Sequence, residues 1–161
     1  MRKRILKGNG TWIALILLVA AASFLYKSTF FSANNLFNVL RQSSMVGMIA
    51  MGMTCVILTG GIDLSVGATV ALTAVLSAML TNYSVVLAVV IPILAGLLVG
   101  TVNGFVITKL KIVPFIATLA IQMAVRGIAY IITNVKSIPV NREQKLFLQI
   151  GRGYLFSVPF R

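Results

Sequence analysis

Long apolar runs are the feature that most constrains this chain. They occupy residues 11–26, 43–59, 64–80, 85–107 and 112–133, and only short polar stretches separate them. A helix rises about 1.5 Å per residue, so roughly 20 apolar residues cross the hydrocarbon core of a bilayer. With 59% hydrophobic and 10% charged residues, a water-soluble fold of 161 residues could not bury its apolar surface. We therefore predict an all-α, polytopic transmembrane helical bundle with about five apolar runs.

The basic residues gather at the ends of the apolar runs. The chain carries 14 Lys and Arg against 2 acids, a formal net charge of +12. In a soluble protein this excess would favour nucleic-acid binding. No basic helix face or aromatic-basic interleaving accompanies the charge here, so we expect contact with membrane lipid and no nucleic-acid partner. The clusters are Arg2, Lys3, Arg4 and Lys7, then Lys109 and Lys111, then Lys136 onward.

The first apolar run follows four basic residues, a layout shared by signal peptides and uncleaved signal anchors. We favour the anchor, because residues 24–26 prolong the run, and we place residues 1–10 in the cytoplasm as a basic N-terminus. If the turn at Lys109 and Lys111 is also cytoplasmic, an even number of crossings separates the two points. The runs at 43–59 and 64–80 then form either a hairpin of two spans or a re-entrant pair.

The segments around the runs complete the predicted organisation. Residues 11–133 form the transmembrane region, within which the mixed segment 28–42 is expected in the membrane interface and Pro92 is expected to kink the fourth run. Pro114 stands in the first turn of the fifth run, where a missing N–H costs least. Residues 134–161 are expected to be a polar loop and a truncated C-terminus.

Residues suited to catalysis or metal binding are scarce. The chain has no His, a single cysteine at Cys55, and two acids, Asp63 and Glu143, far apart in sequence. Acid-base pairs, activated nucleophiles and metal clusters need more than this. We expect no enzymatic activity, no cofactor and no metal site, and we expect Cys55 to pack as a small hydrophobe.

The segment from Gly60 to Gly67 places a carboxylate and flexible backbone between two apolar runs. Gly60, Gly61, Asp63 and Ser65 fit the pattern of a broken helix lining a cavity, so they are candidates for a translocation path. A simpler interpretation is a helix start, in which Asp63 or Ser65 caps the third helix and the glycines supply the turn. The two interpretations are compatible.

Two polar residues share one face of the fifth run. Gln122 and Arg126 are four residues apart. An arginine within a span costs about 2.5–3.5 kcal/mol on insertion scales, so it needs compensation. Asp63 is one candidate partner. Alternatively, Arg126 snorkels to the interface near Thr133, which lies roughly 10 Å away along the helix.

Small residues recur at helical spacing in the fourth run. Gly96, Gly100 and Gly104 form a ridge that lets another helix approach closely, and packing is the default function of such a ridge. Asn103 lies on the same face. It would form a hydrogen bond across the helix contact or face a wet cavity.

Several stretches resemble the bacterial ABC permeases for ribose and related monosaccharides, and they stand in the expected order. The most specific is residues 57–67 (ILTGGIDLSVG), preceded by residues 52–54 (GMT). The others are residues 35–38 (NLFN), 40–42 (LRQ), Asn103-Gly104, 114–119 (PFIATL), Arg126-Gly127 and 151–154 (GRGY).

The resemblance implies a multi-pass permease in the bacterial inner membrane, without catalysis of its own. Such a permease forms a homodimer or heterodimer, receives its sugar from an extracytoplasmic binding protein and is driven by separate ATPase subunits. Members of the family are about twice this length, and their ATPase-docking loop lies in the second half, so we expect the chain to be truncated. The alternative is a non-transporting remnant, or a half-subunit that assembles only with another membrane polypeptide.

Overall fold

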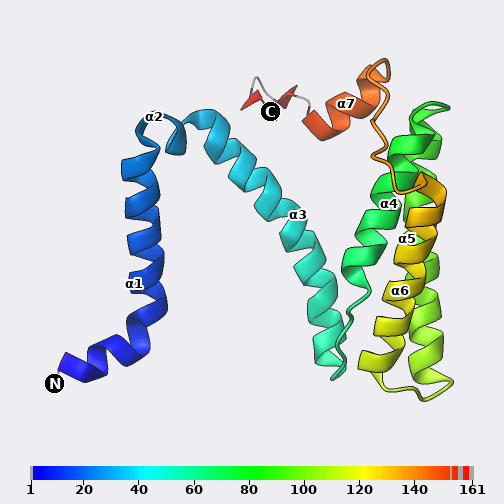
Figure 1. Cartoon of the computed structure of the whole chain (residues 1–161), viewed down its shortest axis with the longest axis horizontal. Helices are drawn as coiled ribbons and strands as arrows, with labels where there is room; N and C mark the ends of the chain where they lie inside the picture. Colours follow the sequence, from blue (N-terminus) through cyan, green and yellow to red (C-terminus); the bar gives the residue numbers. More distant parts are fainter. Residues whose placement is uncertain (1, 153, 156–157, 160–161) are drawn as a thin grey trace. The chain divides into compact units, whose positions relative to one another are not determined.

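The computed structural model describes the backbone of residues 2–152, 154–155 and 158–159, and the side chains of residues 10–149 (Figure 1). The chain divides into two compact units. The first comprises residues 1–44 together with 154–161, and the second comprises residues 45–153.

The first unit contains α1 (Arg2–Leu25), α2 (Lys27–Phe30) and the beginning of α3 (Ala33–Leu58). Its two short strands, β1 (Tyr154–Leu155) and β2 (Val158–Pro159), pair antiparallel. The segment 28–42, for which we expect an interfacial position, forms α2 and the first turns of α3. Ser32 accepts a hydrogen bond from the Asn35 N–H at 3.3 Å and so starts α3, and no Gly or Pro interrupts the helix before Gly47.

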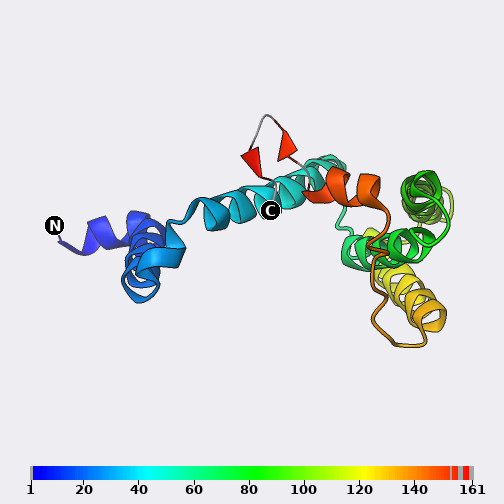
Figure 2. The ribbon, with the colours of Figure 1, turned by 90° about the horizontal axis from the view of Figure 1, so that it is seen from above.

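The second unit is built around three helices that lie side by side, as Figures 1 and 2 show. They are α4 (Val66–Leu80), α5 (Val85–Thr108) and α6 (Pro114–Thr133). Helix α4 packs against both of the others, and α6 runs parallel to it while α5 runs antiparallel. The core cluster includes two alanines, which permit close helix approach. It consists of Ala68, Leu72, Val99, Val125 and Ala129.

Among the described residues, three helices are long and apolar enough to cross a membrane, namely α3, α5 and α6, while the apolar segment Gly10–Leu25 of α1 and the 15-residue α4 are shorter. Large apolar side chains cover their outer surfaces, and Leu98 on α5, for example, is 65% exposed. Such surface is favourable in lipid and unfavourable in water. The all-helical membrane class predicted from the sequence is thus confirmed. Helix α3 begins at Ala33, so it is longer than the second apolar run, which begins at residue 43.

Helix α5 continues through Pro92, which is buried. Proline lacks the N–H that would bond to the carbonyl of Ala88, four residues earlier. The Ser77 hydroxyl of α4 donates to that carbonyl at 2.7 Å. A side chain from the neighbouring helix therefore satisfies the backbone group that Pro92 leaves free, as lipid cannot.

Two details of the second unit correct the sequence prediction. The segment 134–161 is not only loop, because α7 (Lys145–Arg152) forms where apolar residues cluster in the stretch 146–150. Before it, the Asn141 N–H donates to the fully buried Thr81 hydroxyl at 3.0 Å, which fastens the polar segment to the end of α4. Cys55, expected to be packed, is exposed on α3.

Candidate functional site

The break between α3 and α4 begins with a glycine-dependent helix ending. Gly60 adopts a left-handed conformation with φ +75°, and its N–H donates to the Ile57 carbonyl at 2.9 Å. The Gly61 N–H reaches back to the Val56 carbonyl at 3.2 Å. This pair of bonds is a Schellman motif, which satisfies carbonyls that the helix end leaves free. The predicted turn role of the two glycines therefore has a specific form: Gly60 supplies the positive φ, and Gly61 closes the motif.

Thr118 of α6 holds the extended part of the break. Its hydroxyl oxygen accepts a hydrogen bond from the Leu64 N–H at 3.2 Å. As a donor, the same hydroxyl lies 3.2 Å from the Ile62 carbonyl and 2.8 Å from the Pro114 carbonyl. Thr118 is 1% exposed. A non-helical segment at membrane depth needs such partners, because lipid provides none. The side chain thereby fixes the position of Asp63, which lies between the two bonded residues.

Asp63, Ser65 and Asn103 form one chain of hydrogen bonds. Asp63 Oδ1 accepts from the Ser65 N–H at 2.7 Å and from the Ser65 hydroxyl at 2.6 Å. The same hydroxyl accepts from Asn103 Nδ2 at 2.7 Å, across the contact between α4 and α5. Ser65 is the N-cap residue of α4, yet no side chain caps the first-turn amides. The two candidates for a helix cap thus bond to each other and to α5.

The carbonyl oxygen of the Asn103 amide is buried and has no hydrogen-bond partner. The residue is 6% exposed. The assignment of the two amide atoms follows from the hydrogen-bond network, and in either orientation one of them lacks a partner. A buried polar atom left unpaired costs roughly 1–3 kcal/mol, and other atoms of Asn103 line the space beside Ser65.

That space is a cavity of about 200 Å³ between α4 and α5. Its polar lining comes from Asp63, Ser65, Thr69, Thr73 and Asn103. None of the residues that line it is basic, although the chain carries a net charge of +12. The cavity therefore offers hydroxyl groups, an amide and one carboxyl group to a ligand.

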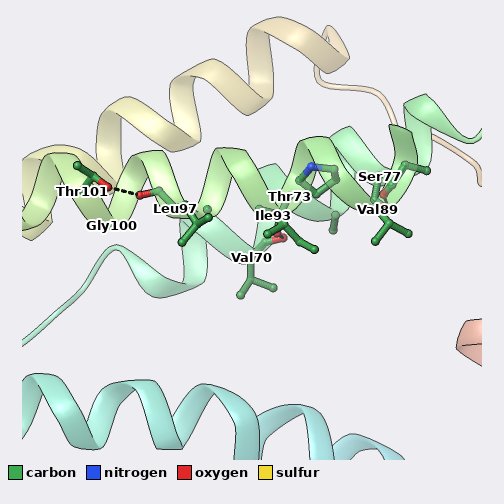
Figure 3. A pocket seen from close by; sticks show the side chains of 12 residues that line it. Val70, Thr73, Ser77, Val89, Ile93, Leu97, Gly100 and Thr101 are labelled. Atoms are coloured by element: carbon green, nitrogen blue, oxygen red, sulfur yellow. Dashed lines mark hydrogen bonds between the residues drawn. The ribbon is translucent and has the colours of Figure 1, made fainter. Parts of the chain in front are cut away.

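A larger, mostly apolar groove of about 930 Å³ adjoins this cavity and shares four lining residues with it. Figure 3 shows side chains of α4 and α5 along it, including Thr73, Ser77 and Ile93. Gly96 and Gly100 line the groove, whereas Gly104 does not. A Cβ atom at Gly96 would lie 3.8 Å from Thr73 Cγ2, and at Gly100 or Gly104 it would meet nothing within 4 Å. Within the described residues, most of the predicted packing ridge therefore faces open space.

The remaining two candidates lie apart from this cluster. Gln122 is half-buried on α6, and Arg126 is exposed and lines a separate cavity with Tyr130 and Thr133. Arg126 stands eight residues beyond Thr118, about 12 Å along the helix from the level of the break. The Asp63–Arg126 ion pair considered from the sequence is not formed between the described side chains, and Asp63 Oδ1 bonds to Ser65.

Sequence reasoning did not identify Thr118 and Ser77. Each carried a usable signal. Thr118 follows Pro114 by four residues, where its hydroxyl can bond back to the first turn of the helix. Pro92 lacks an N–H, so it leaves the Ala88 carbonyl without its helical donor. Hydroxyl residues on neighbouring helices can donate to such groups in membranes.

The comparisons with known proteins agree with one another on a permease. The family model described as "Branched-chain amino acid transport system / permease component" matches residues 35–160. A ribose import permease protein of Bacillus subtilis is 41% identical over 152 residues, which cover 93% of this chain and 47% of that protein. The ribose import permease protein of Haemophilus influenzae is 40% identical over 97% of this chain and 49% of its own length.

A more distant relative is named as a permease for xylose. The xylose transport system permease protein of Haemophilus influenzae is 33% identical over 91% of this chain and 39% of its own length. The chain spans about half the length of the ribose permeases it matches. No solved structure matches it significantly. The family match covers most of α3, the whole of α4 to α7, and the polar cluster of Asp63, Ser65, Asn103 and Thr118. The chain belongs to the family of branched-chain amino acid transport system permease components, among relatives that are ribose and xylose permeases.

Proposed function

We propose that this chain forms part of a permease subunit that carries a monosaccharide of the ribose class across the bacterial cytoplasmic membrane. The observation that carries the proposal is the identity of 40–41% to two ribose import permeases over more than nine-tenths of the chain. The family match spans residues 35–160 and so includes the whole polar cluster. In an otherwise apolar bundle, a buried polar cluster beside a cavity is a feature of a solute path.

The chemistry of the cavity favours a neutral polyhydroxy solute over an amino acid. A sugar hydroxyl can exchange hydrogen bonds with the side chains of Thr69, Thr73 and Asp63, which line the cavity. The ammonium of a branched-chain amino acid could pair with Asp63, but no lining residue supplies a cation for its carboxylate. An unpaired charge in such a place is costly. The cavity thus supports the sugar among the substrate classes that the family description and the relatives' names raise.

The partners we propose are those of an ABC importer: a second permease copy or related subunit, cytoplasmic ATPase subunits and an extracytoplasmic sugar-binding protein. ATP hydrolysis would be performed by the separate subunits, and this chain would contribute the path. Thr118 holds the non-helical break by a few hydrogen bonds, and breaking them would release it. We propose this break as the element that changes the access of the sugar path from one side of the membrane to the other.

A second candidate is a half-subunit that transports only when another membrane polypeptide assembles with it. The observation in its favour is the groove along α4 and α5, where Gly100 faces open space and no described helix covers Leu97. Small residues next to open space in lipid are a packing surface for a further helix.

Uptake of labelled ribose by cells lacking their own ribose permease tests both candidates. The chain is expressed with the binding protein and ATPase subunits of a ribose importer, with or without a polypeptide corresponding to the rest of the relatives' length. Uptake that needs the added polypeptide supports the half-subunit, and uptake without it supports transport by this chain. Absence of uptake in both arms, with the chain present in the membrane, would refute the proposed function.

A matched pair of variants then tests the polar cluster. Asp63→Asn keeps an oxygen that can accept from Ser65 but removes the charge, and Glu143→Gln removes the only other acid, which is exposed. A hydrogen bond to a charged group contributes about 1.5–3 kcal/mol, so Asp63→Asn should lower uptake roughly 10- to 100-fold. Glu143→Gln should leave uptake unchanged. Equal uptake in the two variants would show that Asp63 serves only the local fold.

A further inference from the structure

The cavity at the C-terminal end of α6 carries two cations and no acid. It has a volume of about 470 Å³, and both Arg126 and Lys136 line it, along with Tyr130 and Ser137. Its opposite wall is the surface of α4 around Ala71 to Ala78. Neither of the two acids of the chain, Asp63 and Glu143, belongs to the lining.

Arg126 is a cation without a protein partner among the described side chains. It is exposed on α6, a helix apolar enough to span a membrane, and no described acid pairs with it. The most natural internal partner, Asp63, is engaged with Ser65 at the other end of α4. Charged groups within a span persist when something compensates them, and near the end of α6 the head groups and water of the interface can do so.

The position of the cavity specifies the source of that compensation. The nearby chain is polar, with Asn82 and Tyr83 following α4 and Asn134 ending α6 in a left-handed conformation. Polar residues and tyrosines at helix ends are typical of the membrane–water interface. At this level the abundant anion is the phosphate of a lipid head group, which a pocket lined by an arginine and a lysine can bind.

We propose that Arg126 and Lys136 bind the phosphate of an anionic phospholipid head group, with the lipid entering the cavity between α4 and α6. The planar guanidinium of Arg126 can form paired bonds to phosphate oxygens, and Lys136 adds a second positive charge. The apolar wall of small α4 side chains accommodates the beginning of the acyl chains. The site therefore selects an anionic lipid over a zwitterionic one.

Lipid retention by the purified full chain, measured by native mass spectrometry, tests this proposal. Phosphatidylglycerol is the anionic probe, and phosphatidylcholine is the zwitterionic comparison. Attraction of about 1 kcal/mol per basic residue near a membrane surface corresponds to about fivefold in affinity, so two residues predict roughly 25-fold tighter retention of phosphatidylglycerol. Arg126→Gln and Lys136→Gln should each lose about fivefold.

Two controls keep the result specific. Lys109→Gln removes an exposed cation after α5 and should not change the preference for phosphatidylglycerol. Arg126→Lys preserves the charge and should retain more of the preference than Arg126→Gln, with circular dichroism verifying equal helix content. Equal retention of both lipids, or equal losses in Lys109→Gln and Arg126→Gln, would overturn the proposal. Binding of inorganic phosphate that displaces phosphatidylglycerol at millimolar concentration would overturn the assignment to lipid.

Discussion

Replacing Ser77 with alanine should destabilise the bundle, because the Ala88 carbonyl then loses its hydrogen-bond donor. The Ser77 hydroxyl donates to the Ala88 carbonyl at 2.7 Å, and Ala88 is 1% exposed. Pro92 cannot supply the usual helical N–H to that carbonyl, so the alanine variant leaves it without a donor. An unpaired buried polar group costs about 1–3 kcal/mol, while hydrogen bonds between membrane helices average about 0.6 and reach about 1.7 kcal/mol. We expect a loss of about 1–2 kcal/mol in the free energy of unfolding.

A double-mutant cycle with Pro92→Ala tests the reason for that loss. Alanine at position 92 restores an N–H that can donate to the Ala88 carbonyl, so Ser77→Ala in this background should cost under about 0.5 kcal/mol. Unfolding of the purified chain in mixed micelles with increasing dodecyl sulfate, followed by circular dichroism, measures each corner. Thr101→Ala is the matched control, because its hydroxyl bonds to the Leu97 carbonyl at 2.8 Å on an exposed face (Figure 3) where the helix also supplies an N–H. Equal cost of Ser77→Ala with and without Pro92 would refute the reasoning.

Five further variants probe the break and the polar segment. Gly60→Ala should cost about 1–2 kcal/mol because of φ +75°, whereas Gly61→Ala, whose Cβ would make ordinary contacts at 3.5 and 3.6 Å, should be nearly neutral in the same unfolding assay. Thr118→Val should cost about 1–3 kcal/mol and Thr118→Ser much less, since serine keeps the hydroxyl that binds the Leu64 N–H; equal costs would contradict the assigned bond. Thr81→Val should speed hydrogen exchange at the Asn141 amide while leaving exchange in α5 unchanged.

The sequence by itself was sufficient for the membrane class and for the positions of α4, α5 and α6. Apolar runs without interruption predict helices, because in lipid every backbone group must be satisfied within the segment. The same local logic placed the helix ending at Gly60 and the helix start at Pro114. It failed at residues 33–42, where polar side chains hid a continuous helix, and at α7, which forms inside a segment expected to be loop.

Only the tertiary structure decided which polar side chains meet. Asn103 reaches Ser65 across 38 positions, and Thr118 reaches Ile62 across 56. Helical periodicity shows which residues share a face, but it does not show which helices are neighbours or at what height they cross. The sequence therefore left Asp63 free to pair with Arg126, while the structure gives its carboxyl group to Ser65 and places Arg126 in a second cavity. The reason is physical: a hydrogen bond acts over about 3 Å, and only helix packing brings distant residues that close.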